Sequence, residues 1–389
     1  MTVKMNSSRR QFLGAMTMAA GAYIAPPALL SAQHAPAGRV AVGLCSEYNR
    51  HVVDVLSAMF DQLGGLEKLV RGKTVAIKLN MTGTPTMRLR YLQQGMTTWP
   101  HPQVVGALVH LLGRAGALRI RLLESALVTS EPLQQFMFAA GWMPGDFERA
   151  ANRVEFENTN YLGSGKDYAR FMVPHGGLLF TGYDLNHSYR DCDVFVSLAK
   201  LKEHTTTGVT LSMKNCFGIT PCTIYGQDVP EDEPGLVPTG GRFLLHSGKR
   251  QPPKSAPPEV NLNAPKEDGY RVPRAVADLV AARPIHLAVV DGIYTMAGGE
   301  TPNRHAAPIH PGLLVAGTNC VSTDAACMAL MGFDPMADRG TPPFEKSDST
   351  LRLAEQLGVG TRDLSRVNVA GTPIAKARFD FRRAWNTTV

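Results

Sequence analysis

The sequence predicts an α/β protein with a mostly parallel, doubly wound sheet that is flanked by helices and interrupted by a long Pro-rich excursion. Short runs of Val, Ile, Leu and Ala, typical of strands buried on both faces, recur along the 389 residues. Stretches of helical period lie between them, and this β-α-β repetition favours parallel strands. With 44% hydrophobic residues, the chain can bury one large core or two moderate ones.

The individual elements follow from these patterns in chain order. The apolar runs predict strands at residues 39–44, 74–78, 119–124, 193–198, 285–290, 312–317 and 367–369. The amphipathic stretches predict helices at residues 52–63, 101–114, 207–217, 274–282, 320–331 and 351–357. In the second helix an apolar stripe runs from Val104 to Leu112, and Gly116 follows it as a stop signal.

The excursion spans residues 226–273 and differs from the rest of the chain. It holds nine prolines, several charged residues and little apolar periodicity, so we expect an irregular flap or linker. Because it leaves directly from a lysine-rich stretch, we favour a partly ordered flap over a cleft. Arg242 and His246 are its best candidates for ligand contact.

Polar side chains crowd the end of the predicted strand at residues 193–198. Lys200, Lys202, Glu203 and His204 follow it within six residues. Ligands of open parallel sheets bind beyond the carboxyl ends of the strands, so this cluster predicts a site for an anionic ligand or a cofactor. Each residue alone is more often an ordinary loop residue, and only the combination favours a site.

The next predicted helix has two different faces. Val209, Met213 and Phe217 lie on an apolar side, whereas Lys214 lies on a polar side. Thr205 and Thr206 are expected N-caps. We expect Lys214 and Asn215 to face the space above the strand ends and to hold an anion or a cofactor together with Lys200 and Lys202.

Further candidates follow other strands of the predicted sheet. Asn80, His101 and Glu124 should lie at the same edge as Lys200, on the rim of one cleft, and Asn80 is the expected cofactor contact among them. A glycine-rich loop from Asp291 to Glu300 lacks the spacing of nucleotide-binding loops. Its two carboxylates are either metal ligands or an acid/base pair, or else turn and capping residues.

The stretch from Lys200 to Pro221 resembles a known family. The sequence K-L-K-x-H, followed by T-G-V-T-L-x-x-K-N-x-F-G-x-x-P, is similar to the domain of unknown function 362 family, and the resemblance extends from about Val75 to Asp334. The family's activity is not established. An Asp at the place of Asp324 recurs in its motif, which makes Asp324 a secondary candidate, although that carboxylate also suits a helix N-terminus.

Cysteine spacing bears on the cofactor. Many relatives in that family carry a ferredoxin-like cysteine segment, but none of the six cysteines here forms a C-x-x-C pair, so there is no iron–sulfur or zinc motif of the usual spacing. Cys216 and Cys222 are possible soft metal ligands by residue type, and buried thiols are the ordinary alternative. Disulfides cannot be paired from sequence.

A shorter resemblance concerns His204 and Lys214. Their ten-residue separation, with Thr and Gly between them, is similar to a segment of the nickel-pincer lactate racemase family. The resemblance implies that His204 ligates a metal and that Lys214 carries a covalently attached cofactor. The chain departs from that pattern, because Leu211-Ser212-Met213 replaces the doubled glycine before the lysine.

Residues 1–32 are predicted to be an export signal. Ser8-Arg9-Arg10-Gln11-Phe12-Leu13 precedes a mildly hydrophobic stretch, and the paired arginines resemble a twin-arginine signal with cleavage after Ala32. The stretch is short and contains two prolines, which argues against a stable membrane anchor. We therefore expect residues 33–389 to form the mature α/β domain, a periplasmic or otherwise exported protein that engages the twin-arginine machinery. This route often carries proteins that already hold a cofactor.

Charge excludes one class of partner. The formal net charge is +7, and three of those positive charges belong to the leader, which has no acidic residue. The remaining +4 is mild and dispersed, so no nucleic-acid partner is expected.

Two function classes remain. The preferred one is an exported enzyme, an isomerase or oxidoreductase, that acts on a small organic anion with a metal ion or a metal-containing cofactor. His204, Lys214, Asp291 and Glu300 are its expected catalytic residues, with His204 and Asp291 as metal ligands. The alternative is a periplasmic anion- or metal-binding accessory protein that uses the same cleft without catalysis.

Overall fold

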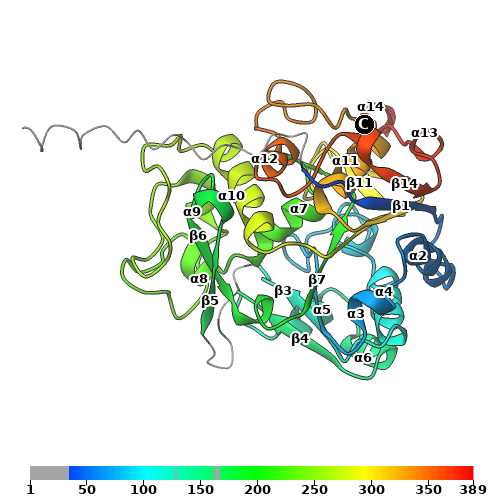
Figure 1. Cartoon of the computed structure of the whole chain (residues 1–389), viewed down its shortest axis with the longest axis horizontal. Helices are drawn as coiled ribbons and strands as arrows, with labels where there is room; N and C mark the ends of the chain where they lie inside the picture. Colours follow the sequence, from blue (N-terminus) through cyan, green and yellow to red (C-terminus); the bar gives the residue numbers. More distant parts are fainter. Residues whose placement is uncertain (1–34, 128, 161, 163–166, 389) are drawn as a thin grey trace, which may run out of the picture.

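The computed structural model describes residues 35–127, 129–160, 162 and 167–388. The predicted signal at residues 1–32 lies outside the described residues. An α/β architecture is observed, as the sequence predicts, with helices on both sides of a central sheet (Figure 1).

The central sheet has eight strands within the described residues, in the order β14-β1-β13-β10-β7-β2-β3-β4. Their bounds in chain order are β1 (Arg39–Leu44), β2 (Thr74–Lys78), β3 (Arg119–Glu124), β4 (Val154–Asn158), β7 (Val194–Lys200), β10 (Leu287–Gly292), β13 (Leu313–Gly317) and β14 (Asn368–Gly371). Neighbouring strands are parallel except at β13, which runs antiparallel to both β1 and β10. The mostly parallel, doubly wound sheet is thereby confirmed.

The strand order reverses between β2 and β7. From β2 the chain proceeds outward through β3 and β4, whereas β7 and β10 lie on the opposite side of β2. The carboxyl ends of these parallel strands therefore meet at one edge, where the register pairs Asp291 of β10 with Lys200 of β7. Such a switch point is where open α/β sheets bind ligands.

Helices cover both faces of this sheet (Figure 1). On one face lie α2 (His51–Gln62), α3 (Glu67–Val70), α4 (Pro102–Arg114), α5 (Leu133–Ala139) and α6 (Pro144–Ala150). On the other lie α7 (Leu211–Asn215), α10 (Asp268–Ala282), α11 (Cys320–Leu330) and α12 (Thr350–Gln356). The sheet separates two hydrophobic clusters, one under each helical layer.

Local sequence explains several of the helix ends. His101 caps α4, because its Nδ1 accepts a hydrogen bond from the Gln103 amide at 3.1 Å, and Pro102 occupies the first turn, where its missing N–H costs nothing. Asn319 caps α11, and Ser349 caps α12, through side-chain oxygens. These predicted helices are therefore found close to their expected bounds.

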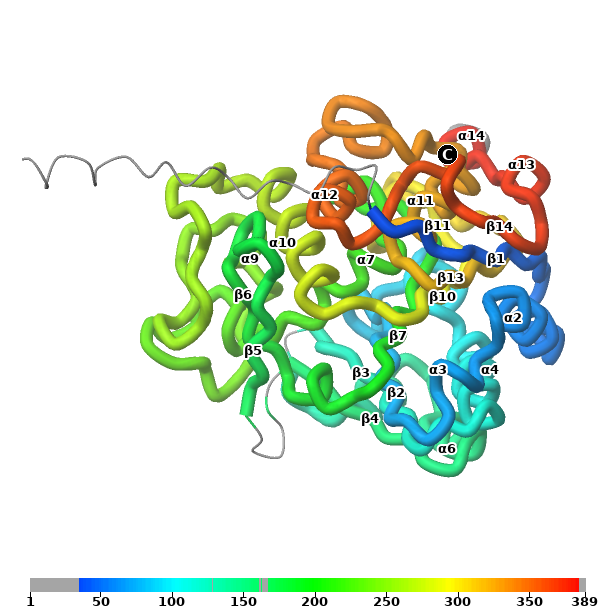
Figure 2. Tube along the Cα trace, viewed as in Figure 1, coloured from blue at the N-terminus to red at the C-terminus, as the bar shows by residue number. Residues whose placement is uncertain are grey.

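The excursion packs beside a hairpin of β5 (Tyr168–Met172) and β6 (Gly182–Asn186), away from the central sheet (Figure 2). A bridge between Phe180 and Glu259 joins the two segments. The short helix α8 (Cys222–Tyr225) directly precedes the excursion, and a second short helix, α9 (Phe243–Ser247), lies within it. The predicted end at residue 273 is too late, because α10 begins at Asp268 and includes Pro273.

The predicted helix at residues 207–217 is wrong in its first half. Glu203–His204 (β8) pairs with Gly208–Val209 (β9) in a small hairpin, and α7 starts only at Leu211. Thr205 and Thr206 are therefore not N-caps. Gly208, at φ +71°, and Leu211, at φ +48°, adopt left-handed backbone conformations, so a continuous helix cannot run from residue 207 into α7.

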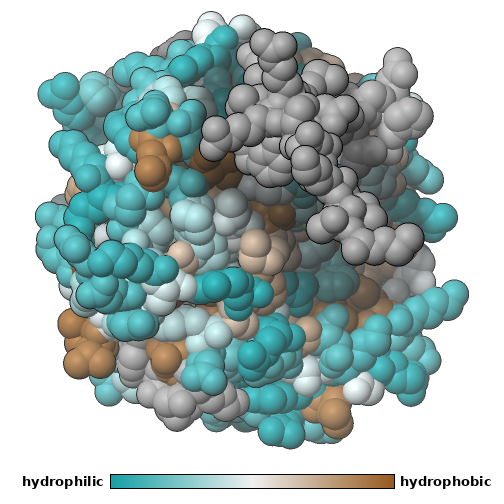
Figure 3. Space-filling model, turned by 60° about the vertical axis from the view of Figure 1, so that its left-hand side comes forward, coloured by the Kyte–Doolittle hydropathy of each residue, from teal (hydrophilic) through white to brown (hydrophobic). Residues whose placement is uncertain are grey.

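The remaining elements complete the described chain. They are β11 (Thr295–Ala297), β12 (Ala307–Ile309), α13 (Ile374–Ala377), α14 (Phe381–Thr388), and the 3-10 helices η2 (Gln94–Met96), η3 (Pro174–Gly176), η4 (His187–Tyr189), η5 (Cys216–Ile219) and η6 (Leu364–Arg366). Among the described residues, no helix is both long and apolar enough to cross a membrane. Among the described residues on the face shown in Figure 3, hydrophilic ones predominate, and hydrophobic ones form small separate groups.

Candidate functional site

A cavity of about 220 Å³ opens beyond the carboxyl ends of β2 and β3, next to the switch point. We call it the site cavity. Its walls come from α7, from residues 80–83, from the excursion at residues 241–246 and from residues 300–301. The polar side chains that line it are those of Lys78, Asn80, Thr82, Glu124, Ser125, His204, Thr206, Thr210, Lys214, Asn215, Arg242, His246, Glu300 and Thr301.

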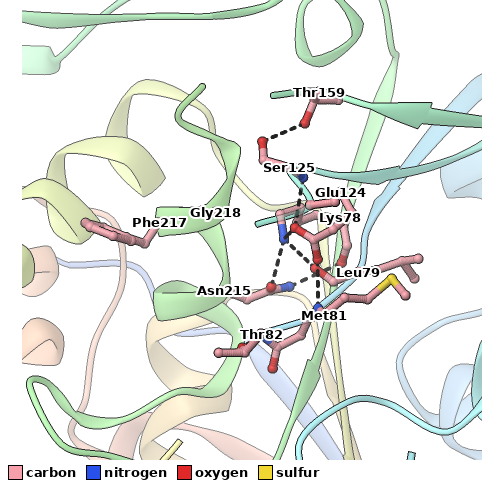
Figure 4. Close-up of polar contacts among 12 residues, drawn as sticks. Lys78, Leu79, Met81, Thr82, Glu124, Ser125, Thr159, Asn215, Phe217 and Gly218 are labelled. Carbon is pink, nitrogen blue, oxygen red and sulfur yellow. Dashed lines mark hydrogen bonds and ion pairs between the residues drawn. The ribbon is translucent and has the colours of Figure 1, made fainter. Parts of the chain in front are cut away.

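The floor of the site cavity is a buried ion pair (Figure 4). Lys78 Nζ lies 2.6 Å from Glu124 Oε1 and 3.3 Å from Asn215 Oδ1, and Glu124 Oε2 accepts a hydrogen bond from the Met81 amide at 2.7 Å. Burial lowers the pKa of Lys78, while the Glu124 carboxylate opposes that shift. Gly218 leaves room for the ammonium, since a Cβ there would lie 2.9 Å from Nζ.

Lys214 is the unpaired cation of the site cavity. Its Nζ makes no hydrogen bond and no ion pair within the part of the chain that the structure describes, and it lies 4.3 Å from the centroid of the Phe217 ring. Burial, together with the positive charges of Arg242 and Lys78, lowers its pKa from 10.5 to about 7 against the opposing attraction of Glu300. The ammonium therefore has three donors and a charge available for a ligand.

Arg242 brings a second unpaired cation from the excursion. Its Nε donates to the Thr220 carbonyl oxygen at 2.9 Å, and one Nη donates to the Gly218 carbonyl oxygen at 3.1 Å. These bonds fix the guanidinium without neutralising it, since it has no carboxylate partner among the described residues. Arg242 is held at a left-handed φ of +59°, an uncommon conformation for a side-chain-bearing residue. Together with Lys214, it makes the cavity suited to an anion.

His204 and Glu300 form the opposite wall. His204 Nδ1 accepts the Thr206 amide at 3.1 Å, so the neutral ring carries its proton on Nε2, which has no hydrogen-bond partner in the described chain. Burial and the nearby charge of Lys214 lower the pKa of His204 well below its usual value. Burial opposes ionisation of Glu300, but the charge of His204, when that ring is protonated at low pH, and two hydrogen bonds from Thr205 outweigh it and lower the pKa to about 2.

Lys200 and Asp291 lie outside the site cavity as a closed pair. Lys200 Nζ is 3.0 Å from Asp291 Oδ2, and it also donates to the Tyr48 hydroxyl and to the Gly95 carbonyl oxygen. Asp291 accepts further bonds from the His101 and Ile293 amides, and both charged side chains are 0% exposed. The charged groups of both side chains are therefore hydrogen-bonded within the protein, and the pair links the carboxyl ends of β7 and β10 beside the site cavity.

Lys202 and Asn80 support the loops around the site cavity. Lys202 Nζ donates to the carbonyl oxygens of Thr98 and Glu300, each at 2.9 Å, and so ties two loops together. Burial lowers its pKa to about 7. Asn80 lines the cavity, while its Oδ1 accepts the Lys200 amide at 3.3 Å.

Asp324 of α11 holds the first turn of α7 in place. Its carboxylate accepts hydrogen bonds from the Ser212 amide at 2.9 Å, from the Ser212 hydroxyl at 2.6 Å and from the Met213 amide at 2.9 Å. These bonds hold the first turn of α7 against the strained φ of Leu211. Because Lys214 follows directly, Asp324 sets where its side chain enters the cavity.

The donor set does not fit a metal ion held by protein ligands alone. Within residues 35–127, 129–160, 162 and 167–388, no three His, Cys, Asp or Glu side chains converge on one point. The expected ligands His204 and Asp291 do not meet, since Asp291 does not line the cavity. All six cysteines are free and buried. A cofactor that supplied its own metal ligands could use His204 as a metal ligand and Lys214 as its attachment point. These are the two roles that the resemblance to the lactate racemase family implies.

The structure brings together most, but not all, of the residues that the sequence predicts for the site. His204, Lys214, Asn215, Glu300 and Asn80 line one cavity. Sequence reasoning missed Lys78, although a lysine that ends the buried run Thr74–Lys78 is the same signal that singled out Lys200. Glu124, expected on the rim, lies instead at the floor as its partner.

The fold and this cavity define an α/β protein with a polar cavity, lined by lysine, arginine and glutamate side chains, next to the switch point of its sheet. The chain belongs to the family described as domain of unknown function (DUF362), whose model matches residues 75–329. No curated protein matches the chain.

Two solved structures show distant similarity. A structural-genomics crystal structure of a Thermotoga maritima protein is 14% identical with a TM-score of 0.35, and the match covers 66% of this chain and 52% of that one. The lactate racemase apoprotein from Thermoanaerobacterium thermosaccharolyticum is 12% identical with a TM-score of 0.32, covering 72% and 55%. The chain therefore spans about half the length of these two structures.

Proposed function

We propose that the protein is an enzyme that binds a small organic anion in the site cavity and moves a proton on it. The observation that carries this proposal is the Lys214 ammonium, which lines a polar cavity without a direct hydrogen bond or ion pair among the described residues. Burying an unpaired cation costs free energy, so its retention suggests that a ligand supplies the missing negative charge.

In this proposal Arg242 binds the anion and Lys214 carries out the chemical step. Arginine keeps its charge and presents a planar fork that suits a carboxylate, so Arg242 would hold the anion. Lys214, with its pKa lowered to about 7, is present in both protonation states near neutral pH. That range is where a general base is most effective.

The residues present support a proton-transfer step. The neutral Lys214 amine would take a proton from the carbon next to the bound carboxyl group, and the electron pair left on carbon would delocalise onto the carboxylate oxygens beside Arg242. His204, which carries its proton on Nε2, would return a proton to carbon from another direction, and proton exchange between the residues would restore the starting state. The result is an isomerisation of the anion.

Hydrogen exchange tests this reaction class. Protein would be incubated in D₂O with a panel of 2-hydroxy and 2-amino acids, and deuterium incorporation at the carbon next to the carboxyl group would be followed by proton NMR. We expect incorporation into at least one anion and loss of it in Lys214→Met. An anion that binds tightly without any exchange would contradict the enzyme proposal and favour an anion-binding accessory protein.

A cofactor that carries its own metal is the alternative to this reaction, because a Lys214 amine joined to a cofactor could not act as the base. It would supply hydride or Lewis-acid chemistry, with His204 as a protein ligand and Lys214 as its attachment point. This arrangement is supported only by the presence of both side chains in one cavity. Elemental analysis and intact-mass measurement of protein from its native host would show a metal equivalent, or added mass on the peptide containing Lys214. An unmodified, metal-free protein would contradict it.

We also propose that the protein is exported, on the basis of the sequence Ser8-Arg9-Arg10-Gln11-Phe12-Leu13. Replacing Arg9 and Arg10 together by lysine should retain the precursor in the cytoplasm, whereas the unaltered protein should appear outside it with a new N-terminus near Gln33. Equal distribution of the two forms would contradict the proposal.

A further inference from the structure

A second group of unpaired cations lies outside the site cavity. Arg88, Arg90 and Arg304 line an open hollow of about 390 Å³, together with Leu89, Pro302, Asn303 and Ala306. We call it the arginine hollow. All three arginines are exposed, and none has an ion-pair partner within the described parts of the chain, although Arg304 Nε donates a hydrogen bond to His305 Nε2 at 2.8 Å.

The arginine hollow stands on ordered structure. Its floor residues Leu89 and Ala306 are almost fully buried and pack with Met296 of β11 in a small hydrophobic cluster of their own. This contact joins the long loop after β2 to the loop between β11 and β12. The two walls of the hollow are therefore fixed relative to each other.

Contacts within each of the two loops also hold the walls of the arginine hollow. On one side, Leu89 and Leu92 form a tight turn in which Arg90 has a φ of +58°, a conformation that side-chain-bearing residues seldom adopt. On the other side, the Asn303 side chain donates to the Gly298 carbonyl oxygen at 3.1 Å and accepts the His305 amide at 2.8 Å. These turns hold the three arginines around one space.

Three guanidinium groups gathered without a carboxylate repel one another, and a bound anion would relieve that repulsion. Guanidinium presents parallel N–H donors that match the oxygens of a phosphate group, and three of them can surround a doubly or multiply charged anion. The open, mostly polar hollow suits a charged group that stays partly hydrated. We propose that the arginine hollow is a binding site for a phosphate-bearing ligand.

The position of this site relates it to the site cavity. The loop that carries Arg88 and Arg90 also supplies Asn80 and Thr82 to the site cavity, and the loop that carries Arg304 also supplies Glu300. A ligand in the hollow would therefore clamp the two loops that wall the site cavity. The binding itself does not depend on the function proposed above.

Titration with inorganic pyrophosphate tests the site directly. By isothermal titration calorimetry at low ionic strength, we expect one pyrophosphate per chain, with affinity falling as salt is added. Arg88→Gln and Arg304→Gln should each weaken binding about tenfold, the change expected for loss of one charge-assisted contact. The matched control Arg50→Gln removes an exposed arginine outside the hollow and should bind normally.

Two further arms distinguish the alternatives. Lys214→Met should leave pyrophosphate binding unchanged, and binding that is lost in Lys214→Met but kept in Arg304→Gln would overturn the proposal in favour of the site cavity. Sedimentation with phosphatidylcholine vesicles, with and without phosphatidylglycerol, tests a lipid source. Binding only to the anionic vesicles, abolished by Arg304→Gln, would assign a lipid phosphate to the hollow. Failure of both pyrophosphate and anionic vesicles to bind would refute the site.

Discussion

Replacing Lys214 by methionine should stabilise the protein while it removes ligand binding. A pKa lowered from 10.5 to about 7 corresponds to about 4–5 kcal/mol of preference for the neutral form over the charged form in the folded state. Water in the cavity screens part of this preference, since Lys214 is partly exposed. We therefore expect Lys214→Met to raise the free energy of unfolding by about 1–2 kcal/mol at pH 7. Methionine keeps the contact with the Phe217 ring.

The lowered pKa of Lys214 also makes the stability of the protein depend on pH. Between pH 7 and 10.5 the unfolded chain keeps the Lys214 proton that the folded protein has lost, so the stability of the native protein rises with pH across this window. Lys214→Met should lack this component. Urea denaturation at several pH values measures both effects.

Lys200→Met is the matched control. It leaves the buried Asp291 carboxylate without its cation and should destabilise the protein by about 3 kcal/mol or more. A Lys214→Met variant that is destabilised like Lys200→Met would refute the reasoning, because Lys214 would then be a structural cation.

Three further predictions concern single side chains around the cavity. Arg242→Gln should weaken anion binding about tenfold in calorimetry, because it removes a charge-assisted contact, and unchanged affinity would exclude Arg242 from the site. Glu300 has a pKa lowered to about 2, so it contributes stability above pH 4.5 that is lost as the pH falls toward 2. In Glu300→Gln the free energy of unfolding should fall less between pH 4.5 and 2 than in the native protein. An equal fall in both proteins would contradict this. Asp324→Asn should lower the free energy of unfolding by about 2 kcal/mol in urea denaturation. The new side-chain amide N–H would face the backbone N–H of Ser212 or Met213, both of which now donate to the carboxylate. It should also weaken anion binding by displacing Lys214, and an affinity equal to that of the native protein would contradict that positioning role.

Buried strands were predictable because their signal is local. Thr74–Lys78 and Arg119–Glu124 have the expected bounds, since each is an apolar run that ends in a charged residue. The polar residues at these ends also indicate one edge of the sheet from the sequence alone, because parallel strands place their carboxyl ends together.

Pairing at that edge was not predictable, because it depends on strand order. Lys200 and Asp291 form a closed pair because β7 and β10 are neighbours in register, a contact between residues 91 positions apart. Sequence places both at strand ends but cannot say that they satisfy each other rather than a ligand. Arg242 enters the cavity from the excursion, where no periodicity indicates its direction.

The helix expected at residues 207–217 failed for a similar reason. Its apolar spacing is genuine, but Thr205 bonds to Glu300 in a distant loop and Leu211 is held at φ +48° beside Asp324. Tertiary contacts therefore override the local periodicity and give a hairpin followed by a short helix.

Anion binding to purified protein and to Lys214→Met tests the central claim most directly. A panel of small carboxylates would be titrated by calorimetry at pH 6.5, where the native Lys214 is largely charged. We expect at least one carboxylate to bind with a stoichiometry of one and Lys214→Met to weaken that binding tenfold or more. Absence of binding to the native protein, or equal affinity in the variant, would contradict it.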